Sequence, residues 1–122
     1  MDDTDRAKLI GAWQSNADGA TWIFAQDGDT LHITHLQKDR KLADFACNTS
    51  GRECSVKEDG KSAKVSMWFN GPKLVVMETQ GSEVVKRRFQ PGGEGDVIEV
   101  ETIPIVPEGK PETAKLNRAA AK

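Results

Sequence analysis

The chain has 122 residues, of which 37% are hydrophobic and 30% charged, and 17 basic against 19 acidic side chains leave a net charge of -2. This length predicts a single domain, residues 1–122, and the composition is too apolar for an intrinsically disordered chain. Basic and acidic residues are mixed along the chain, so nucleic acid is not an expected partner. No stretch of 18 apolar residues is present, so no membrane span is predicted.

The first half of the chain alternates short apolar runs with turn signals. Residues 3–10 are predicted to form a short helical turn, with Thr4 as its cap. Strand-like runs then occupy residues 9–14, 21–25, 30–36, 42–47 and 53–57. Asp-Gly and similar turn sequences separate them, as is typical of antiparallel strands.

Residues 62–90 read as a β-meander of three apolar, β-branched runs. Asn70-Gly71 separates the first two runs, and Asn-Gly between alternating runs is a strong hairpin signal. A two-residue loop at this position predicts that Met67 faces Leu74 on the neighbouring strand. A second tight turn follows between the second and third runs.

The second turn, at Gly81-Ser82, predicts that Glu78 faces Val85. Because side chains alternate along a strand, these turns assign every residue of the meander to one of two faces. The mostly apolar face collects Val65, Met67, Phe69, Leu74, Val76, Glu78, Val85, Arg87 and Phe89.

Residues 97–103 and 112–118 complete the series of strands, and residues 119–122 are expected to form a tail. Nine or ten short strands with turn signals every 8–12 residues predict an all-β sandwich or barrel. Tight connections favour pairing between consecutive strands. An antiparallel up-and-down barrel is the expected closure, because it leaves no edge strand.

Two cysteines, Cys47 and Cys54, flank a turn predicted at Ser50-Gly51. That turn places them opposite each other on paired strands, where Cα atoms about 4.5–5.5 Å apart permit a disulfide. A disulfide indicates an oxidising compartment, so a secreted or periplasmic protein is expected, with any leader already removed before Met1. The alternative is a pair of reduced thiols.

Gly11-Ala12-Trp13 near the start of the chain resembles the Gly-x-Trp opening of the lipocalins and their calycin relatives. The overall layout also resembles that of small exported lipocalin-like β-barrel domains of bacteria, whose final hairpin is similar to residues 109–111. The resemblance implies an up-and-down barrel that carries a small molecule.

The same resemblance implies a partner for Trp13. In the calycin superfamily this tryptophan closes one end of the barrel and stacks on a basic residue late in the chain. Arg87 or Arg88, and more remotely Arg118, are the residues of this chain that could take that place.

The apolar face of the meander is the predicted binding site for a small apolar or amphipathic ligand, because a barrel interior either fills with side chains or holds one ligand. Its predicted ligand-binding residues are Val65, Met67, Phe69, Val76, Val85, Arg87 and Phe89. Arg87 would bind an acidic head group, as guanidinium groups bind carboxylates bidentately. The fatty-acid-binding relatives use an Arg-x-Tyr pair similarly, and here Phe89 replaces the tyrosine. The alternatives for Arg87 are an internal ion pair with Glu78 or stacking on Trp13.

A second interpretation is a side-chain-filled barrel that serves as a protein-interaction or cell-envelope module. Trp68 lies on the opposite, lysine-rich face of the meander, together with Val75, Met77 and Val84. An exposed patch of this kind predicts a homodimer through the Trp68 face, or cover by a terminal segment. The alternative is a monomer in which a lysine stem covers the ring.

Metal binding and catalysis find little support. His32 and His35 are three residues apart on a predicted strand, so they face opposite sides, and each is expected at the surface or at an edge. Residues 27–29 and 94–96 lack the calcium-loop pattern and are expected to be hairpin turns. No nucleophile elbow or phosphate-binding loop is present, so no catalytic residue, metal or cofactor is predicted.

Overall fold

A computed structural model of the protein describes residues 8–15, 18–38, 40–58, 60–92 and 97–119. These residues form ten strands, whose bounds are β1 Gly11–Ser15, β2 Ala20–Asp27, β3 Thr30–Gln37, β4 Arg40–Asn48, β5 Cys54–Glu58, β6 Lys61–Asn70, β7 Lys73–Gln80, β8 Glu83–Pro91, β9 Val97–Val106 and β10 Glu112–Arg118. The described part of the chain contains no helix. The helical turn predicted over residues 3–10 lies mostly outside it, and residues 8–9 form a turn. Of the predicted tail, residue 119 alone is described, and its amide donates to Ala12 O over 2.8 Å.

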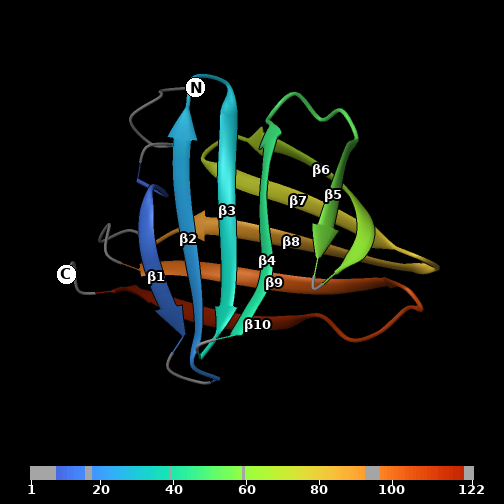
Figure 1. Ribbon diagram of the computed structural model, residues 1–122. Coiled ribbons are helices and arrows are strands. Elements are labelled where there is room, and N and C mark those ends of the chain that lie inside the picture. The colour runs from blue at the N-terminus through green and yellow to red at the C-terminus, as the bar shows by residue number, and fades with distance from the viewer. Residues whose placement is uncertain (1–7, 16–17, 39, 59, 93–96, 120–122) are drawn as a thin grey trace.

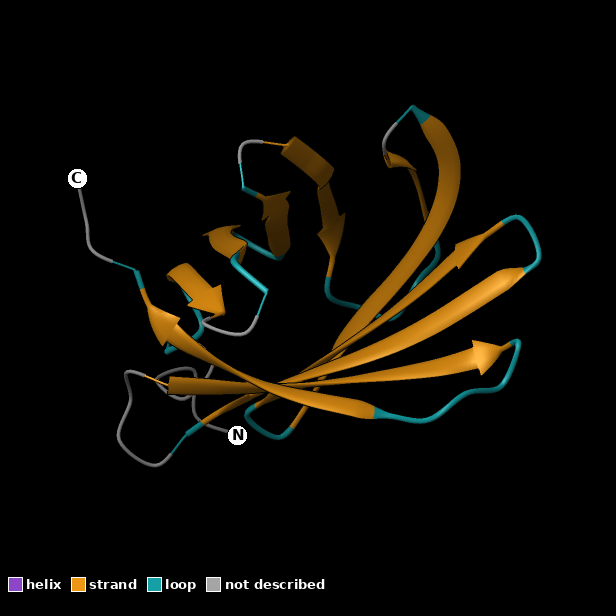
Figure 2. Ribbon diagram, turned by 90° about the horizontal axis from the view of Figure 1, so that it is seen from below, coloured by secondary structure: helices purple, strands orange, loops and turns teal. Residues whose placement is uncertain are grey.

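The strands form one antiparallel sheet in the order β4-β3-β2-β1-β10-β9-β8-β7-β6-β5. Figure 1 shows β1–β4 crossing β6–β10 at a steep angle, so the sheet folds over and its two layers face each other. In Figure 2 every described element is a strand or a connecting loop. The prediction of an all-β, antiparallel barrel is therefore confirmed.

The predicted complete closure is wrong. β4 and β5 stand at the two ends of the strand order, and no ladder joins them in the described part of the chain. The barrel is therefore nearly closed and has two edge strands. The connection between β4 and β5 is not a tight hairpin that would pair them. Instead, Ser50 of this connection forms an isolated bridge with Trp68 of β6.

The predicted disulfide between Cys47 and Cys54 is present, with the two Cα atoms 6.1 Å apart. Its expected setting on two paired strands is wrong, since it links the edge strands β4 and β5. It lies at the end of β4 and the start of β5. The bridge therefore joins the two margins of the sheet where backbone hydrogen bonds do not.

The hairpin between β6 and β7 turns one residue later than predicted. Its two-residue loop is Gly71-Pro72, and Met67 faces Val76 rather than Leu74. Gly71 has a φ of 66°, as a type II′ turn requires at its first central position. The resulting shift of two residues leaves each side chain on its predicted face, because the faces alternate with a period of two.

The hairpin between β7 and β8 has the predicted register, with Glu78 opposite Val85. The inner face of the meander is thus the predicted apolar one. Val65, Met67, Leu74 and Phe89 each have an exposed fraction of 0%.

The barrel interior has two ends, which the directions of the strands distinguish. At the closed end, where β1 and β3 begin and β2 ends, large apolar side chains fill the space, among them Trp13, Phe24, Leu31 and Phe89. At the opposite end, here called the mouth, β1 and β3 end and β2 begins. The side chains around the mouth are more polar, and this contrast positions the candidate site.

Candidate ligand-binding site

A cavity of about 340 Å³ lies at the mouth, between β1–β3 and β8–β10. It is lined by Ser15, Asp18, Ala20, Trp22, His35, Arg87, Val100, Thr102, Glu112, Thr113, Ala114 and Leu116. The apolar side of this lining is buried: Trp22 is 7% exposed, Val100 6% and Leu116 1%. Asp18 and Glu112 are exposed. The cavity therefore has an apolar floor and a charged rim, which suits an amphipathic molecule.

Arg87 reaches the cavity in an ion pair. Its Nη1 lies 2.6 Å from Oε1 of Glu78, and the two side chains are 20% and 16% exposed. The guanidinium carbon lies 5.3 Å from the ring centroid of Trp22. Of the alternatives predicted for Arg87, the internal ion pair is the one observed, and Trp22 rather than Trp13 is the ring beside it. The charge of Arg87 is thus balanced within the protein, as a largely buried charge requires.

His35 stacks on Trp22, with ring centroids 3.7 Å apart and an angle of 11° between the planes. Burial, and next the positive charge of Arg87, lower the pKa of His35 from 6.5 to about 4, although Glu78 and Asp18 act in the opposite direction. His35 is therefore neutral at pH 7. A flat aromatic stack with one neutral imidazole forms part of the cavity wall.

The two histidines face opposite sides of β3, as predicted. His32 is exposed and hydrogen-bonds to Asp44 of β4, a contact that lowers the pKa of that carboxyl together with the bond from Lys41. The expectation that His35 also lies at the surface or an edge is wrong, because it shares the inward face of β3 with buried Leu31 and Ile33.

The seven predicted ligand-binding residues all belong to the inward face but lie at different depths. They are Val65, Met67, Phe69, Val76, Val85, Arg87 and Phe89. Among them, Arg87 lines the cavity. Val65, Met67, Val76 and Phe89 are at most 2% exposed and pack in the core. Phe69 is partly buried against that core, and Val85 is half-buried.

Sequence reasoning missed the cavity residues outside the meander, above all Trp22, His35 and Leu116. A usable signal was present in the alternation of residues 20–24, in which Ala20, Trp22 and Phe24 occupy every second position. The same alternation places His35 with the inward residues of β3. Residues 62–90 supply one wall of the cavity, and strands outside this stretch supply the rest.

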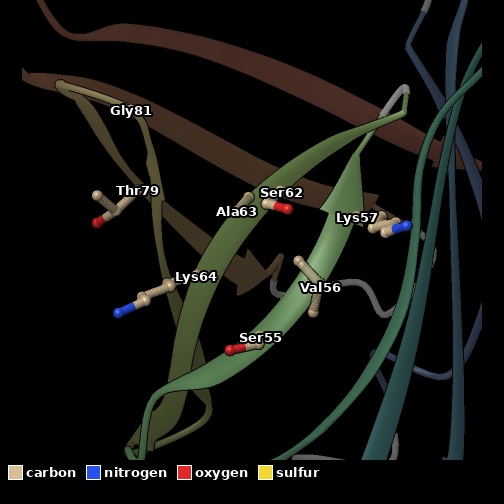
Figure 3. A pocket seen from close by; sticks show the side chains of 8 residues that line it. All are labelled: Ser55, Val56, Lys57, Ser62, Ala63, Lys64, Thr79 and Gly81. Atoms are coloured by element: carbon tan, nitrogen blue, oxygen red, sulfur yellow. The ribbon is translucent and has the colours of Figure 1, made fainter.

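A larger hollow of about 570 Å³ lies along β5–β7 (Figure 3). Most of its lining side chains, such as Ser55, Ser62 and Lys64, are exposed and polar. In Figure 3, the amino groups of Lys57 and Lys64 extend to opposite sides. Of its lining residues, Ala63 alone is buried, whereas Trp22, Val100 and Leu116 of the mouth cavity are all buried. We therefore take the mouth cavity as the candidate site.

The outer face around Trp68 is less open than predicted. Val75 faces Trp68 and Arg88 on the neighbouring strands and is 2% exposed, while Trp68 itself is half-buried. Arg88 pairs with Glu101 on this face, with 3.2 Å between Nη1 and Oε1. Self-association through this face stays a prediction.

Residues 28–29 form the predicted turn between β2 and β3, whereas the turn predicted at residues 94–96 lies outside the described residues. Within the described ranges, no group of three or more His, Cys, Asp or Glu side chains could hold a metal ion. The same ranges contain no helix of the length and apolarity needed to cross a membrane.

The partner of Trp13 is Arg118, the most remote of the three predicted arginines, whose guanidinium lies over the indole ring. Arg87 and Arg88 are instead paired with glutamates within the meander and its neighbour β9. The opening motif and the last strand are thus joined at the closed end, as the calycin resemblance implies.

The chain is similar to known proteins in its fold. No protein-family profile and no curated protein sequence matches it. Among solved structures, the REP1-NXSQ fatty acid transporter is 16% identical with a TM-score of 0.76, covering 95% of this chain and 99% of that one. Lipid binding protein 8 of Caenorhabditis elegans is 9% identical, with a TM-score of 0.74 and coverages of 92% and 96%.

A secretory abundant heat soluble protein of Ramazzottius varieornatus is 12% identical, with a TM-score of 0.74 and coverages of 92% and 96%. Identities this low show a shared fold and not a shared activity. The chain therefore has the calycin fold, as the nearly closed, ten-stranded antiparallel barrel that it shares with these lipid-binding and heat-soluble proteins.

Proposed function

We propose that the protein reversibly binds one small apolar or amphipathic molecule in the barrel interior, as a lipocalin-like carrier. The observation that carries this proposal is the mouth cavity, in which a buried apolar floor meets a few polar side chains. Pockets of this composition and of about 300–1,000 Å³ are typical of small-molecule sites. The solved structures with this fold that are named for fatty acids or lipids are consistent with such a ligand.

In this proposal the ligand tail lies against Trp22, Val100 and Leu116, where burying apolar surface contributes about 25 cal/mol per Å² before the costs of binding. The head group lies near Arg87 and His35. The other predicted ligand-binding residues, Val65, Met67, Phe69, Val76, Val85 and Phe89, form the inner wall that limits how deep the tail can reach.

The disulfide supports a proposed location outside the reducing cytosol, because disulfides persist in oxidising compartments. We propose a secreted or periplasmic protein of bacterial type, in line with the resemblance of its opening and final hairpin to exported bacterial domains.

Native mass spectrometry with a panel of fatty acids, alkyl amphiphiles and tetrapyrroles tests the proposed function. We expect a retained or added ligand at a 1:1 ratio. Ala114→Leu, which extends a side chain into the cavity, should weaken binding, and the matched variant Ala46→Leu on the exposed face of β4 should not. Absence of any bound molecule at micromolar concentrations would contradict the proposal.

The packed closed end favours a second candidate, a filled barrel that binds another protein or the cell envelope through the Trp68 face. This candidate predicts a homodimer that Trp68→Ser dissociates. Analytical ultracentrifugation of the variant and the parent distinguishes the two functions, since ligand binding at the mouth does not require Trp68.

A further inference from the structure

The charges around the mouth cavity are unequal. Asp18 and Glu112 line the cavity, and Glu78 pairs with the one lining residue that is basic, Arg87. Three carboxylates against one guanidinium leave two net negative charges among these described residues. His35 adds no charge at pH 7, because its pKa is about 4.

The position of Arg87 in its ion pair affects ligand binding as much as the net charge around the cavity does. Its guanidinium already donates to Glu78 over 2.6 Å in a site where both side chains are mostly buried. A ligand carboxylate at this guanidinium would lie close to the carboxylate of Glu78, in a medium of lower dielectric constant than water. Like charges that share a site repel strongly under these conditions.

The rim adds to this effect. Oδ1 of Asp18 accepts a hydrogen bond from the amide of Ala20 over 2.9 Å, which holds its carboxylate beside the cavity. Glu112 begins β10 and faces Thr102 of β9. Asp18 and Glu112 thus add two carboxylates to the lining that a ligand head group at the mouth would meet.

We propose that the mouth selects amphiphiles with a cationic head group, such as an alkylammonium, over carboxylates of the same tail length. This inference rests on the proposed function and gives its ligand a chemical class. The tail occupies the apolar floor in either case, so the difference in affinity comes from the head group. Clefts lined by one sign of charge concentrate ligands of the opposite sign.

Isothermal titration calorimetry with decyltrimethylammonium and decanoate, each below its micelle concentration at pH 7 and low salt, tests the selectivity. We expect the cationic ligand to bind about tenfold more tightly, a difference of about 1.4 kcal/mol. Added salt should reduce the ratio, because the exposed rim charges are screened over about 10 Å at 0.1 M.

Two variants test whether the carboxylates at the mouth cause the selectivity. Glu78→Gln releases Arg87 from its ion pair, so it should shift the affinity ratio toward decanoate by about tenfold or more. Glu112→Gln, an exposed change that leaves the interior intact, should shift the ratio in the same direction by less. Glu101→Gln is the matched control, because it breaks the Arg88 ion pair on the outer face. The control should leave the ratio unchanged.

The results that would contradict the proposed function differ from those that would contradict the charge selectivity. If neither amphiphile binds, the proposed function is overturned, and the selectivity with it. If both bind and decanoate binds equally or more tightly, the carrier function stands and the selectivity is overturned. A ratio that Glu101→Gln shifts as much as Glu78→Gln would also overturn the assignment to the mouth.

Discussion

Arg118 at the end of β10 lies over Trp13 of β1, with its guanidinium carbon 4.2 Å from the ring centroid. The same side chain donates from Nη1 to Ile10 O over 3.1 Å and from Nη2 to Lys8 O over 3.2 Å. The indole nitrogen of Trp13 donates to Leu9 O over 2.9 Å. One cation–π contact and three hydrogen bonds thus fix the segment before β1 across the closed end.

Gly11→Ala should destabilise the protein. A Cβ at this position would lie 2.5 Å from Nη1 of Arg118, and the φ of Gly11 is +130°, which side chains rarely adopt. We expect a loss of about 1–3 kcal/mol in the free energy of unfolding, measured by urea denaturation. Gly28→Ala is the control, with positive φ but open space around it. Equal losses in the two variants would show that the Arg118 contact contributes nothing.

Phe89→Ala should be among the most destabilising single changes in the chain. Phe89 is 0% exposed, and its ring meets those of Trp22 and Phe24 edge-on at centroid distances of 5.1 Å. Removing a ring from such a site costs about 3–5 kcal/mol, through lost burial and a new cavity. Phe89→Leu should recover more than half of that loss. A loss below about 1 kcal/mol for the alanine variant would mean that the closed end is loosely packed.

The titration of His35 should make the protein less stable in acid. Its pKa is about 4 in the folded protein and 6.5 in a solvated chain. Between these values the unfolded chain binds a proton that the folded protein does not, so stability is present above pH 6.5 and falls as the pH decreases toward 4. Urea midpoints from pH 7 to pH 4 should show this slope, and His35→Phe should reduce it. An NMR titration midpoint near 6.5 for His35 would contradict the explanation.

Reducing the Cys47–Cys54 bridge should lower stability. For cysteines seven positions apart in sequence, the loop-closure estimate is about 2–3 kcal/mol. Urea denaturation of the parent with and without a reducing agent measures the loss, and the Cys47→Ala, Cys54→Ala double variant should show the same change in either buffer. Hydrogen exchange should rise mainly in β4 and β5. Faster exchange spread evenly over all ten strands would instead indicate a global effect.

The sequence predicts the strands and their faces well because both depend on local patterns. Alternation assigned Met67 and Phe89 to the interior whatever the turn, since a shift of two residues preserves the face. The position of the turn depends on whether Gly71 is the first or the second residue of the two-residue loop. The sequence Asn70-Gly71-Pro72 allows either position. Local patterns therefore gave the inner surface and missed one register.

The relationships that could not be predicted are those between strands distant in sequence. Nothing local to Cys47 and Cys54 shows that β4 and β5 would be the margins of the sheet, because that depends on how ten strands curve together. Stacking of His35 on Trp22 and the position of Arg87 beside them likewise require β3, β2 and β8 to meet around one space.

The covalent bridge and the mouth lie at opposite ends of the barrel, and this separation has a mechanical consequence. The seam between the two margins is fastened beside the closed end, where Cys47 and Cys54 meet. We therefore expect opening of the seam to be smallest there and to grow toward Arg40 and Glu58, at the other ends of β4 and β5. We expect the oxidised protein to open more readily at the end that holds the mouth cavity, so in the proposed function the disulfide favours ligand entry at that end.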